Sequence, residues 1–207
     1  MKRICDKNIW GTVCGCGTDV FIMQELHPWG KNNGESIKIK CKKCGTVNNV
    51  TAVLACEFYN KKIFEVFENV NGSVLEIGCG GGLITRYLAN KKDITQILAV
   101  DKNVCFQEND NEEEIIKNLN APYLKVDLDN FNPGIFKTQF NYVVCRDVLM
   151  YLKDIDYTFS QLKPVTKKGM VLLNWYNKAH KNCINKTPPK KIKKILQKHW
   201  KTVTLEY

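Results

Sequence analysis

Residues 74–83 read VLEIGCGGGL, an apolar run that carries one acid, Glu76, and then breaks into four glycines. Similar short apolar runs recur along the chain, and stretches with helical spacing lie between them. This alternation predicts a doubly wound α/β domain whose parallel sheet is covered on both faces. The predicted strands are residues 73–78, 96–101, 122–127, 140–145 and 169–175.

The glycine turn is a candidate ligand site, because ligands of open parallel sheets bind at the carboxyl ends of the strands. Glycines can adopt positive φ and let a ligand approach the backbone closely. The pattern E-x-G-x-G-x-G, which starts at Glu76, is not the dinucleotide fingerprint, since that would need glycine at Leu83. No lysine follows for a phosphate-binding loop. An acid here disfavours a pyrophosphate and suits a ligand that bears an ammonium and a sulfonium.

Two further acids end predicted strands. Asp101 closes the second strand, about 20 residues after the turn, where an acid can accept hydrogen bonds from both ribose hydroxyls. Asp127 closes the third strand and is placed to meet the edge of an adenine. Together with Glu76, these acids describe a site for a cationic nucleoside.

The segments VLEIGCGGG, AVD, VDLD and CRDVLMYLKD resemble class I S-adenosylmethionine-dependent methyltransferases, over roughly residues 60–207. The resemblance implies a Rossmann-like sheet and S-adenosylmethionine as cofactor. It also implies that the glycine turn faces the methionine part, that Asp101 binds the ribose and that Asp127 contacts the adenine amine. The backbone carbonyl of Cys145, after the fourth strand, would bind the methionine ammonium. The expected cofactor-binding residues are Glu76, Gly78, Gly80, Asp101, Lys102, Asp127, Leu128 and Cys145.

The methyl acceptor should lie beyond the fourth and fifth strands. CRDVLMYLKD looks like the small-substrate type of these enzymes, in which a histidine commonly stands where Tyr151 does. Asp147 and Tyr151 are the catalytic candidates, and the alternative for Asp147 is a helix cap. Trp175, Tyr176 and His180 are further residues that could contact an acceptor or belong to the core or surface. The chain also reads as one strand short of the seven usual in the family.

The ten cysteines divide into a front cluster and single, scattered residues. CKKCG (41–45) has the form of a zinc knuckle, whereas CGCG (14–17) has one residue between its cysteines instead of two. Cys5 is an alternative ligand. Residues 19–26 and 36–40 are expected to form a hairpin between the two knuckles. The expected ligands of a structural zinc ion are Cys14, Cys16, Cys41 and Cys44.

Three segments therefore follow along the chain. Residues 1–50 form a small zinc ribbon, residues 51–70 a connecting helix, and residues 71–207 the methyltransferase domain. The stretch SIKIKCKKCGTVNNV (36–50) is also similar to the second knuckle of the Com zinc-finger proteins of Mu-like phages, which bind messenger RNA.

The formal net charge is +10, and nine lysines fall between residues 177 and 207 with Glu206 as the only acid. Lysines that neutralise phosphates, together with a zinc ribbon, favour a nucleic-acid partner. The alternative is a solvated amphipathic helix. Methyl transfer to RNA or DNA at a ring nitrogen or an oxygen is expected, since the N/D-P-P-Y/F/W loop of amino methylation and a Pro-Cys nucleophile are both missing. A small-molecule acceptor, or a non-catalytic nucleic-acid-binding protein on this scaffold, remains open.

The chain has neither an apolar stretch of about 20 residues nor the apolar segment of a signal peptide. We therefore expect a cytoplasmic protein with no membrane partner.

Overall fold

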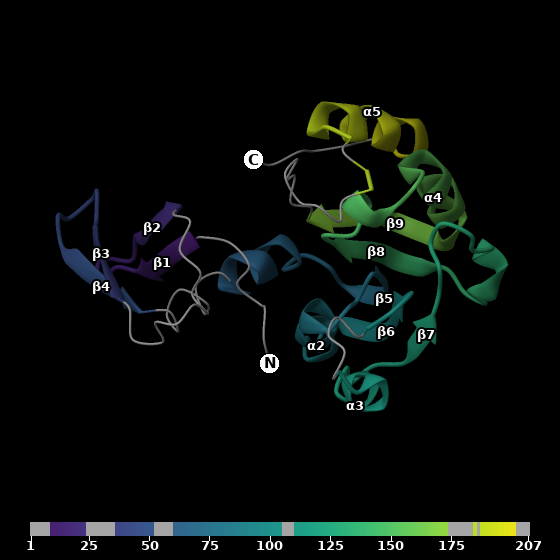
Figure 1. Ribbon diagram of the computed structural model, residues 1–207, viewed down its shortest axis with the longest axis horizontal. Coiled ribbons are helices and arrows are strands. Elements are labelled where there is room, and N and C mark those ends of the chain that lie inside the picture. The colour runs from purple at the N-terminus through teal and green to yellow at the C-terminus, as the bar shows by residue number, and fades with distance from the viewer. Residues whose placement is uncertain are drawn as a thin grey trace. The chain divides into compact units, whose positions relative to one another are not determined.

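A computed structural model describes residues 9–23, 36–51, 60–104, 110–173, 184–185 and 187–201. The chain divides into two compact units, residues 1–66 and 67–207 (Figure 1). Residues 60–66 are helical. Of the rest of the predicted connecting helix, Thr51 belongs to a strand instead, residues 52–59 lie outside the described residues, and residues 67–69 form a turn.

The second unit is built on a five-stranded parallel sheet in the order β7-β6-β5-β8-β9. The strands are β5 (Gly72–Ile77), β6 (Ile94–Asp101), β7 (Tyr123–Lys125), β8 (Phe140–Arg146) and β9 (Thr166–Leu173). The chain starts at the central strand, moves outward to β7, and then crosses to the other side of β5. The connections on the two sides of β5 therefore run in opposite directions away from its carboxyl end, which is where ligands of such sheets bind. The predicted doubly wound fold is confirmed.

Helices cover both faces of this sheet (Figure 1). The α-helices are α2 (Leu83–Ala89), α3 (Glu112–Lys117), α4 (Ile155–Leu162) and α5 (Pro189–His199). Three short 3-10 helices are η1 (Pro133–Ile135), η2 (Leu149–Tyr151) and η3 (Lys163–Val165). None of the helices in the described part of the chain combines the length and the apolar character of a membrane span.

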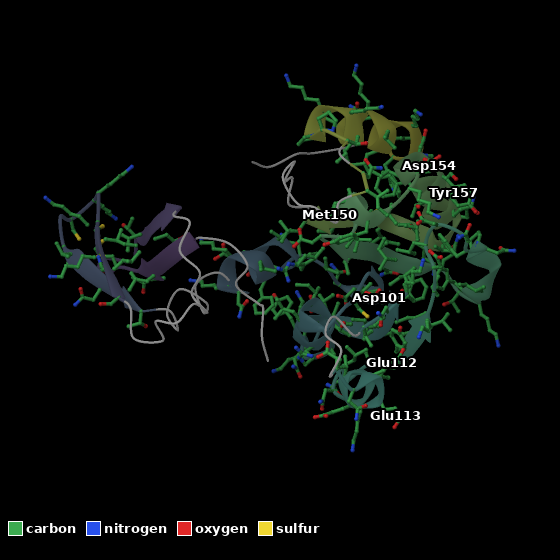
Figure 2. The ribbon with its side chains drawn as sticks, viewed as in Figure 1. Asp101, Glu112, Glu113, Met150, Asp154 and Tyr157 are labelled. Atoms are coloured by element: carbon green, nitrogen blue, oxygen red, sulfur yellow. The ribbon has the colours of Figure 1, made fainter. Side chains whose placement is uncertain are left out.

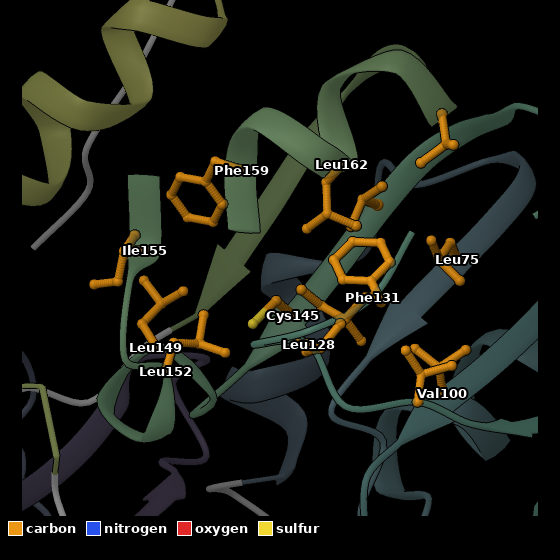
Figure 3. Close-up of a cluster of buried hydrophobic side chains, with 14 of the residues drawn as sticks. Leu75, Val100, Leu128, Phe131, Cys145, Leu149, Leu152, Ile155, Phe159 and Leu162 are labelled. Carbon is orange, nitrogen blue, oxygen red and sulfur yellow. The ribbon is translucent and has the colours of Figure 1, made fainter. Parts of the chain in front are cut away.

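The two faces of the sheet carry different cores, because side chains alternate along each strand. Leu75, Val143 and Cys145 point to the face on which α4 and α5 pack, and they join Phe159 and Leu162 there (Figure 3). Alternate residues point to the opposite face, where a smaller cluster joins Cys79, Ala99, Val104 and Leu119. The polar residues of the candidate site belong to this second face or to the strand ends.

The first unit contains two separate antiparallel hairpins. They pair β1 (Ile9–Val13) with β2 (Asp19–Met23), and β3 (Ser36–Lys40) with β4 (Val47–Thr51). The predicted pairing of residues 19–26 with 36–40 is therefore wrong. Each cysteine knuckle is itself the turn of a hairpin, so each strand pairs across its own knuckle.

Candidate functional site

The glycine turn joins β5 to α2 in a conformation that only glycine takes easily. Gly78, Gly80 and Gly82 have φ values of 69°, 50° and 78°. A Cβ atom on Gly78 would lie 2.0 Å from Cγ2 of Val148, and one on Gly82 would lie 2.2 Å from Cδ2 of Leu119. Backbone strain and close packing thus explain the glycines at both ends of the turn.

Asp101 ends β6 and is tied directly to the glycine turn (Figure 2). The N–H of Gly80 donates to its Oδ2 at 2.7 Å, and the N–H of Asn103 donates to its Oδ1 at 3.0 Å. Burial raises the pKa of Asp101, while these backbone hydrogen bonds act in the opposite direction. Each carboxylate oxygen can accept more than one hydrogen bond, so ribose hydroxyls can still be bound.

Glu76 lies in β5 and is only 3% exposed. Its Oε2 atom is buried and makes no hydrogen bond within the described residues. Burial raises the pKa of Glu76 to about 8, and the nearby Asp101 carboxylate adds to this effect. A buried, unpaired carboxylate oxygen is costly, and a cationic ligand would satisfy it.

Asp127 does not close the third strand as predicted, since β7 ends two residues earlier, at Lys125. Lys102 Nζ lies 2.9 Å from Asp127 Oδ2, and this contact lowers the pKa of Asp127. The side chain of Leu128 is buried in the core. Lys102 therefore contacts another predicted site residue, and Leu128 offers only its backbone to a ligand.

The end of β8 brings the remaining candidates close to the turn. Cys145 lies within the strand, which ends at Arg146 rather than at Cys145, and its side chain is buried in the core. Asp147 has a φ of 56°, and it caps no helix: the N-cap of η2 is Val148, with no side-chain cap bond. Tyr151 ends η2 and is 45% exposed.

Several sequence candidates lie outside the described residues. They are Cys5, Trp175, Tyr176 and His180. One residue that the sequence reasoning missed is Arg146, which sits beside Asp147 with Nε 3.4 Å from Asp147 Oδ2. The alternation of side chains along β8 could have identified Arg146 from the sequence, because it places this residue on the same face as Val144.

The structure thus gathers Glu76, the glycine turn and Asp101 at the carboxyl edge of neighbouring strands. The segment from Asp147 to Tyr151 adjoins them, because Val148 packs against Gly78. A buried carboxylate with an unpaired oxygen, a second carboxylate held by backbone N–H groups and a glycine turn together fit a nucleoside that carries positive charge. These features match S-adenosylmethionine in chemical type.

A second cluster lies in the first unit, where the Sγ atoms of four cysteines are all within 4.8 Å of one another. Cys14 Sγ lies 3.5 Å from Cys44 Sγ, and Cys16 Sγ lies 3.8 Å from Cys41 Sγ. Zinc–sulfur bonds of about 2.3 Å in tetrahedral geometry separate the sulfurs by roughly 3.8 Å. The four predicted ligands are therefore brought together at spacings that fit one zinc ion.

The two knuckles have the same hydrogen-bonding scheme despite their different lengths. The N–H of Gly17 donates to Cys14 O at 2.8 Å, and the N–H of Gly45 donates to Cys41 O at 2.9 Å. The first turn spans one residue fewer, which accounts for the single residue between Cys14 and Cys16. Both glycines have positive φ, 79° and 77°.

A threonine hydroxyl follows each knuckle at the same position. Thr18 Oγ1 lies 3.4 Å from Cys16 Sγ, and Thr46 Oγ1 lies 3.2 Å from Cys44 Sγ. The Thr46 hydroxyl is the main cause that lowers the pKa of Cys44 to about 6. A hydroxyl that stabilises thiolate suits a metal ligand, because the thiolate is the form that binds metal.

Comparison with known proteins agrees with this geometry. Residues 75–172 match a family described as a methyltransferase domain. No curated protein matches the chain.

Two solved structures share the fold at low sequence identity. One is the N-methyltransferase NodS from Bradyrhizobium japonicum WM9, with 16% identity over 69% of this chain and 80% of that chain, at a TM-score of 0.51. The other, described as StiE O-MT, has 14% identity over 72% of this chain and 52% of that chain, at a TM-score of 0.50. At such identities the likeness concerns the fold and says nothing about the acceptor.

Proposed function

We propose that this S-adenosylmethionine-dependent methyltransferase transfers its methyl group to a nucleic acid, at a ring nitrogen or an oxygen. The cofactor supplies the electrophilic methyl group of an in-line displacement. The protein must therefore bind the cofactor, align the acceptor and exclude water. The observation that carries the proposed cofactor site is the link from the Gly80 N–H to Asp101 beside the unpaired Glu76 carboxylate.

Each predicted cofactor contact has a proposed role. Glu76 faces the positive charge of the methionine part, and the glycine turn lies along it. Asp101 accepts hydrogen bonds from the ribose hydroxyls. Asp127, which is paired with Lys102, contacts the adenine, and so does the backbone of Leu128. The backbone carbonyl of Cys145 accepts a hydrogen bond from the methionine ammonium.

Acceptor chemistry is assigned to the segment after β8. Asp147 is the proposed base or orienting group, and the exposed Tyr151 is a contact for the acceptor. A base is needed only when the acceptor atom carries a proton.

Substitution of Asp101 tests the cofactor site. Asp101→Ala removes a carboxylate that would accept charge-assisted hydrogen bonds, so S-adenosylmethionine should bind about 1.5–3 kcal/mol more weakly by calorimetry. Asp93→Ala, which removes an exposed acid just before the opposite end of β6, is the matched control. Equal affinity in Asp101→Ala and the wild type would place the ribose elsewhere.

A structural zinc ion in the cysteine cluster is the second part of the proposal. Four thiolates close the coordination sphere, which leaves no position for a substrate. Clustered cysteines that hold a metal are typical of a reducing compartment, which favours the cytoplasm.

The nucleic-acid partner is supported by the charge of the second hairpin. Lys38 and Lys40 are exposed and lie on one face of β3, since alternate residues share a face. Lys42 and Lys43 are exposed in its knuckle. Residues 36–51 contain no acid, whereas the first hairpin, residues 9–23, contains no lysine or arginine. The basic charge of this module is therefore concentrated on one hairpin.

Lysines of the larger unit form a second basic surface. Ile192 and Leu196 of α5 are buried, and the lysines around them face solvent. The exposed lysines of this region are Lys190, Lys191, Lys194, Lys198 and Lys201. Such a surface binds phosphates without sequence preference.

Binding to tRNA and to duplex DNA over a salt series tests the partner. A Lys38→Gln/Lys40→Gln variant should bind more weakly and lower the slope of log affinity against log salt by up to about 0.9 for each lost contact with duplex DNA. The exposed pair Lys117→Gln/Lys137→Gln is the control with the same change of charge.

The acceptor itself is identified by transfer of labelled methyl from S-adenosylmethionine to the same nucleic acids. Cofactor binding without transfer to RNA or DNA, combined with affinity that is independent of salt, would contradict a nucleic-acid acceptor and leave a small molecule.

A further inference from the structure

Three charged residues share one face of the sheet at its carboxyl edge. In the parallel register, Glu76 of β5 lies opposite Ala99 of β6 and Val144 of β8. Residues two positions apart in a strand point to the same face. Asp101, two residues after Ala99, and Arg146, two residues after Val144, therefore flank the position of Glu76 on its own face.

Arg146 is held at the edge of the proposed cofactor site. Its side chain is 22% exposed, and its Nε atom is buried. Its Nε lies 3.4 Å from Asp147 Oδ2, in the residue that has the left-handed backbone. Burial raises the pKa of Glu76, and the positive charges of Arg86 and Arg146 act against that rise. The two side chains are thus close enough to interact electrostatically.

The methionine part of the cofactor carries an ammonium and a carboxylate on the same carbon. A protein group that binds the carboxylate must therefore stand beside the group that faces the ammonium. Guanidinium is the side chain that best matches a carboxylate, and its five donors allow a contact with Asp147 to coexist with a bound ligand.

We infer that Arg146 binds the carboxylate of the methionine part of S-adenosylmethionine, next to the ammonium that Glu76 faces. The inference rests on the proposed cofactor site and adds an anion-binding group to it. Together, Glu76 and Arg146 recognise a zwitterion, so the site selects ligands that retain an intact amino-acid end.

Arg86 is the other cation near Glu76, and it has a different task. Its Nη1 donates to Gly81 O at 2.7 Å, so it holds the glycine turn. A Cβ atom on Gly82 would lie 3.1 Å from the same Nη1 atom. Arg86 is therefore the matched control, since it is an arginine beside the same carboxylate with a role in the turn.

The experiment compares two ligands, S-adenosylmethionine and its decarboxylated analogue, in calorimetric titrations. The wild type should prefer S-adenosylmethionine by about 10-fold or more, the scale of a charge-assisted hydrogen bond. Arg146→Met should lose this preference, because it weakens binding of S-adenosylmethionine and leaves the affinity for the analogue unchanged. Arg86→Met should change both affinities by the same factor and keep their ratio.

Arg146→Lys provides a second reading if Arg146→Met does not fold, and it should retain an intermediate preference because the charge remains. A preference that persists in Arg146→Met or is undiminished in Arg146→Lys overturns the inference. Equal binding of both ligands by the wild type also overturns it, while leaving the methyltransferase site intact. A wild type that binds neither ligand would instead refute the proposed function.

Discussion

Among the residues that the structure describes, the first unit buries a cluster of five, two of them cysteines, whereas the second buries eighteen around one face of its sheet. A core as small as the first cannot offset the conformational entropy of a folded chain, so such modules depend on metals or disulfides. The second unit has enough apolar burial to fold without a metal. We therefore expect the two units to unfold under different perturbations.

Removal of zinc should give the largest difference between the two units. Structural zinc sites contribute about 10–16 kcal/mol of binding energy that is also folding energy, so a chelator or Cys41→Ser should unfold the first unit. Amide NMR spectra would show lost dispersion for residues 9–23 and 36–51. Affinity for S-adenosylmethionine should be unchanged, and a first unit that stays folded without metal would refute the metal-dependent half of the comparison.

The converse perturbation is a cavity in the larger core. Phe159 is fully buried (Figure 3). Its ring packs edge-on against Trp200, with 5.8 Å between the ring centroids. Phe159→Ala should lower the free energy of unfolding by about 3–5 kcal/mol. Tyr157→Ala, on the same helix but 40% exposed, should cost much less. Urea unfolding measures both, and the zinc content should not change in either variant.

Glu76 shows a conflict between stability and function within the second unit. It is a proposed ligand-binding group, and its burial reduces the stability of the fold at neutral pH. Burial raises its pKa from an ordinary 4.5 to about 8, so the folded state holds the proton more tightly than the unfolded state. Its contribution to stability is complete below about pH 4 and is lost as pH rises through about 8, by up to about 1.4 kcal/mol per pKa unit.

Glu76→Gln should remove this part of the pH dependence in urea unfolding. Binding of a cation favours the ionised carboxylate, so affinity for S-adenosylmethionine should increase with pH up to about 8 in the wild type and stay flat in Glu76→Gln. A wild-type unfolding curve that is independent of pH between 5 and 8, in the range set by these two pKa values, would show that Glu76 is not perturbed.

The smallest expected effect lies within the glycine turn. Gly78→Ala adds a Cβ atom that would collide with the Val148 side chain, and it puts an alanine at a positive φ. The two effects together should lower the free energy of unfolding by about 1–3 kcal/mol. Gly81→Ala meets no atom within 4 Å and should change stability by no more than about 0.5 kcal/mol. Thermal unfolding compares the two, and equal costs would mean that packing against Val148 does not select glycine.

Prediction from sequence succeeded where the signal is local. The apolar runs identified the five strands that the structure describes in the second unit, because a strand buried on both faces must be continuously apolar. The four cysteines expected to bind zinc were also correctly placed in one cluster, since the tight turns of the knuckles appear as CGCG and CKKCG. The residues at the glycine turn followed from the same kind of local pattern.

Prediction failed for the pairing of the hairpins and for some of the site contacts. β4 has the sequence VNNVT, and its two asparagines are typical of a turn. In the structure this segment is a strand because it pairs with β3. The Lys102–Asp127 ion pair joins residues that are far apart in sequence, and no spacing rule announces it. Asp147 was open between a helix cap and a substrate contact, and the structure places the N-cap of η2 at Val148 instead.

By itself, the sequence determined the order of the elements, the glycine turn, the acids that follow the strands and the set of cysteines that cluster. These are properties of short segments, where steric limits and side-chain periodicity act over a few residues. Only the tertiary structure decided which strands pair, which oxygen of Glu76 is left unpaired, and that Arg146 shares the face of Glu76. Those features depend on the register between strands distant in sequence, and register is settled by packing of the whole sheet.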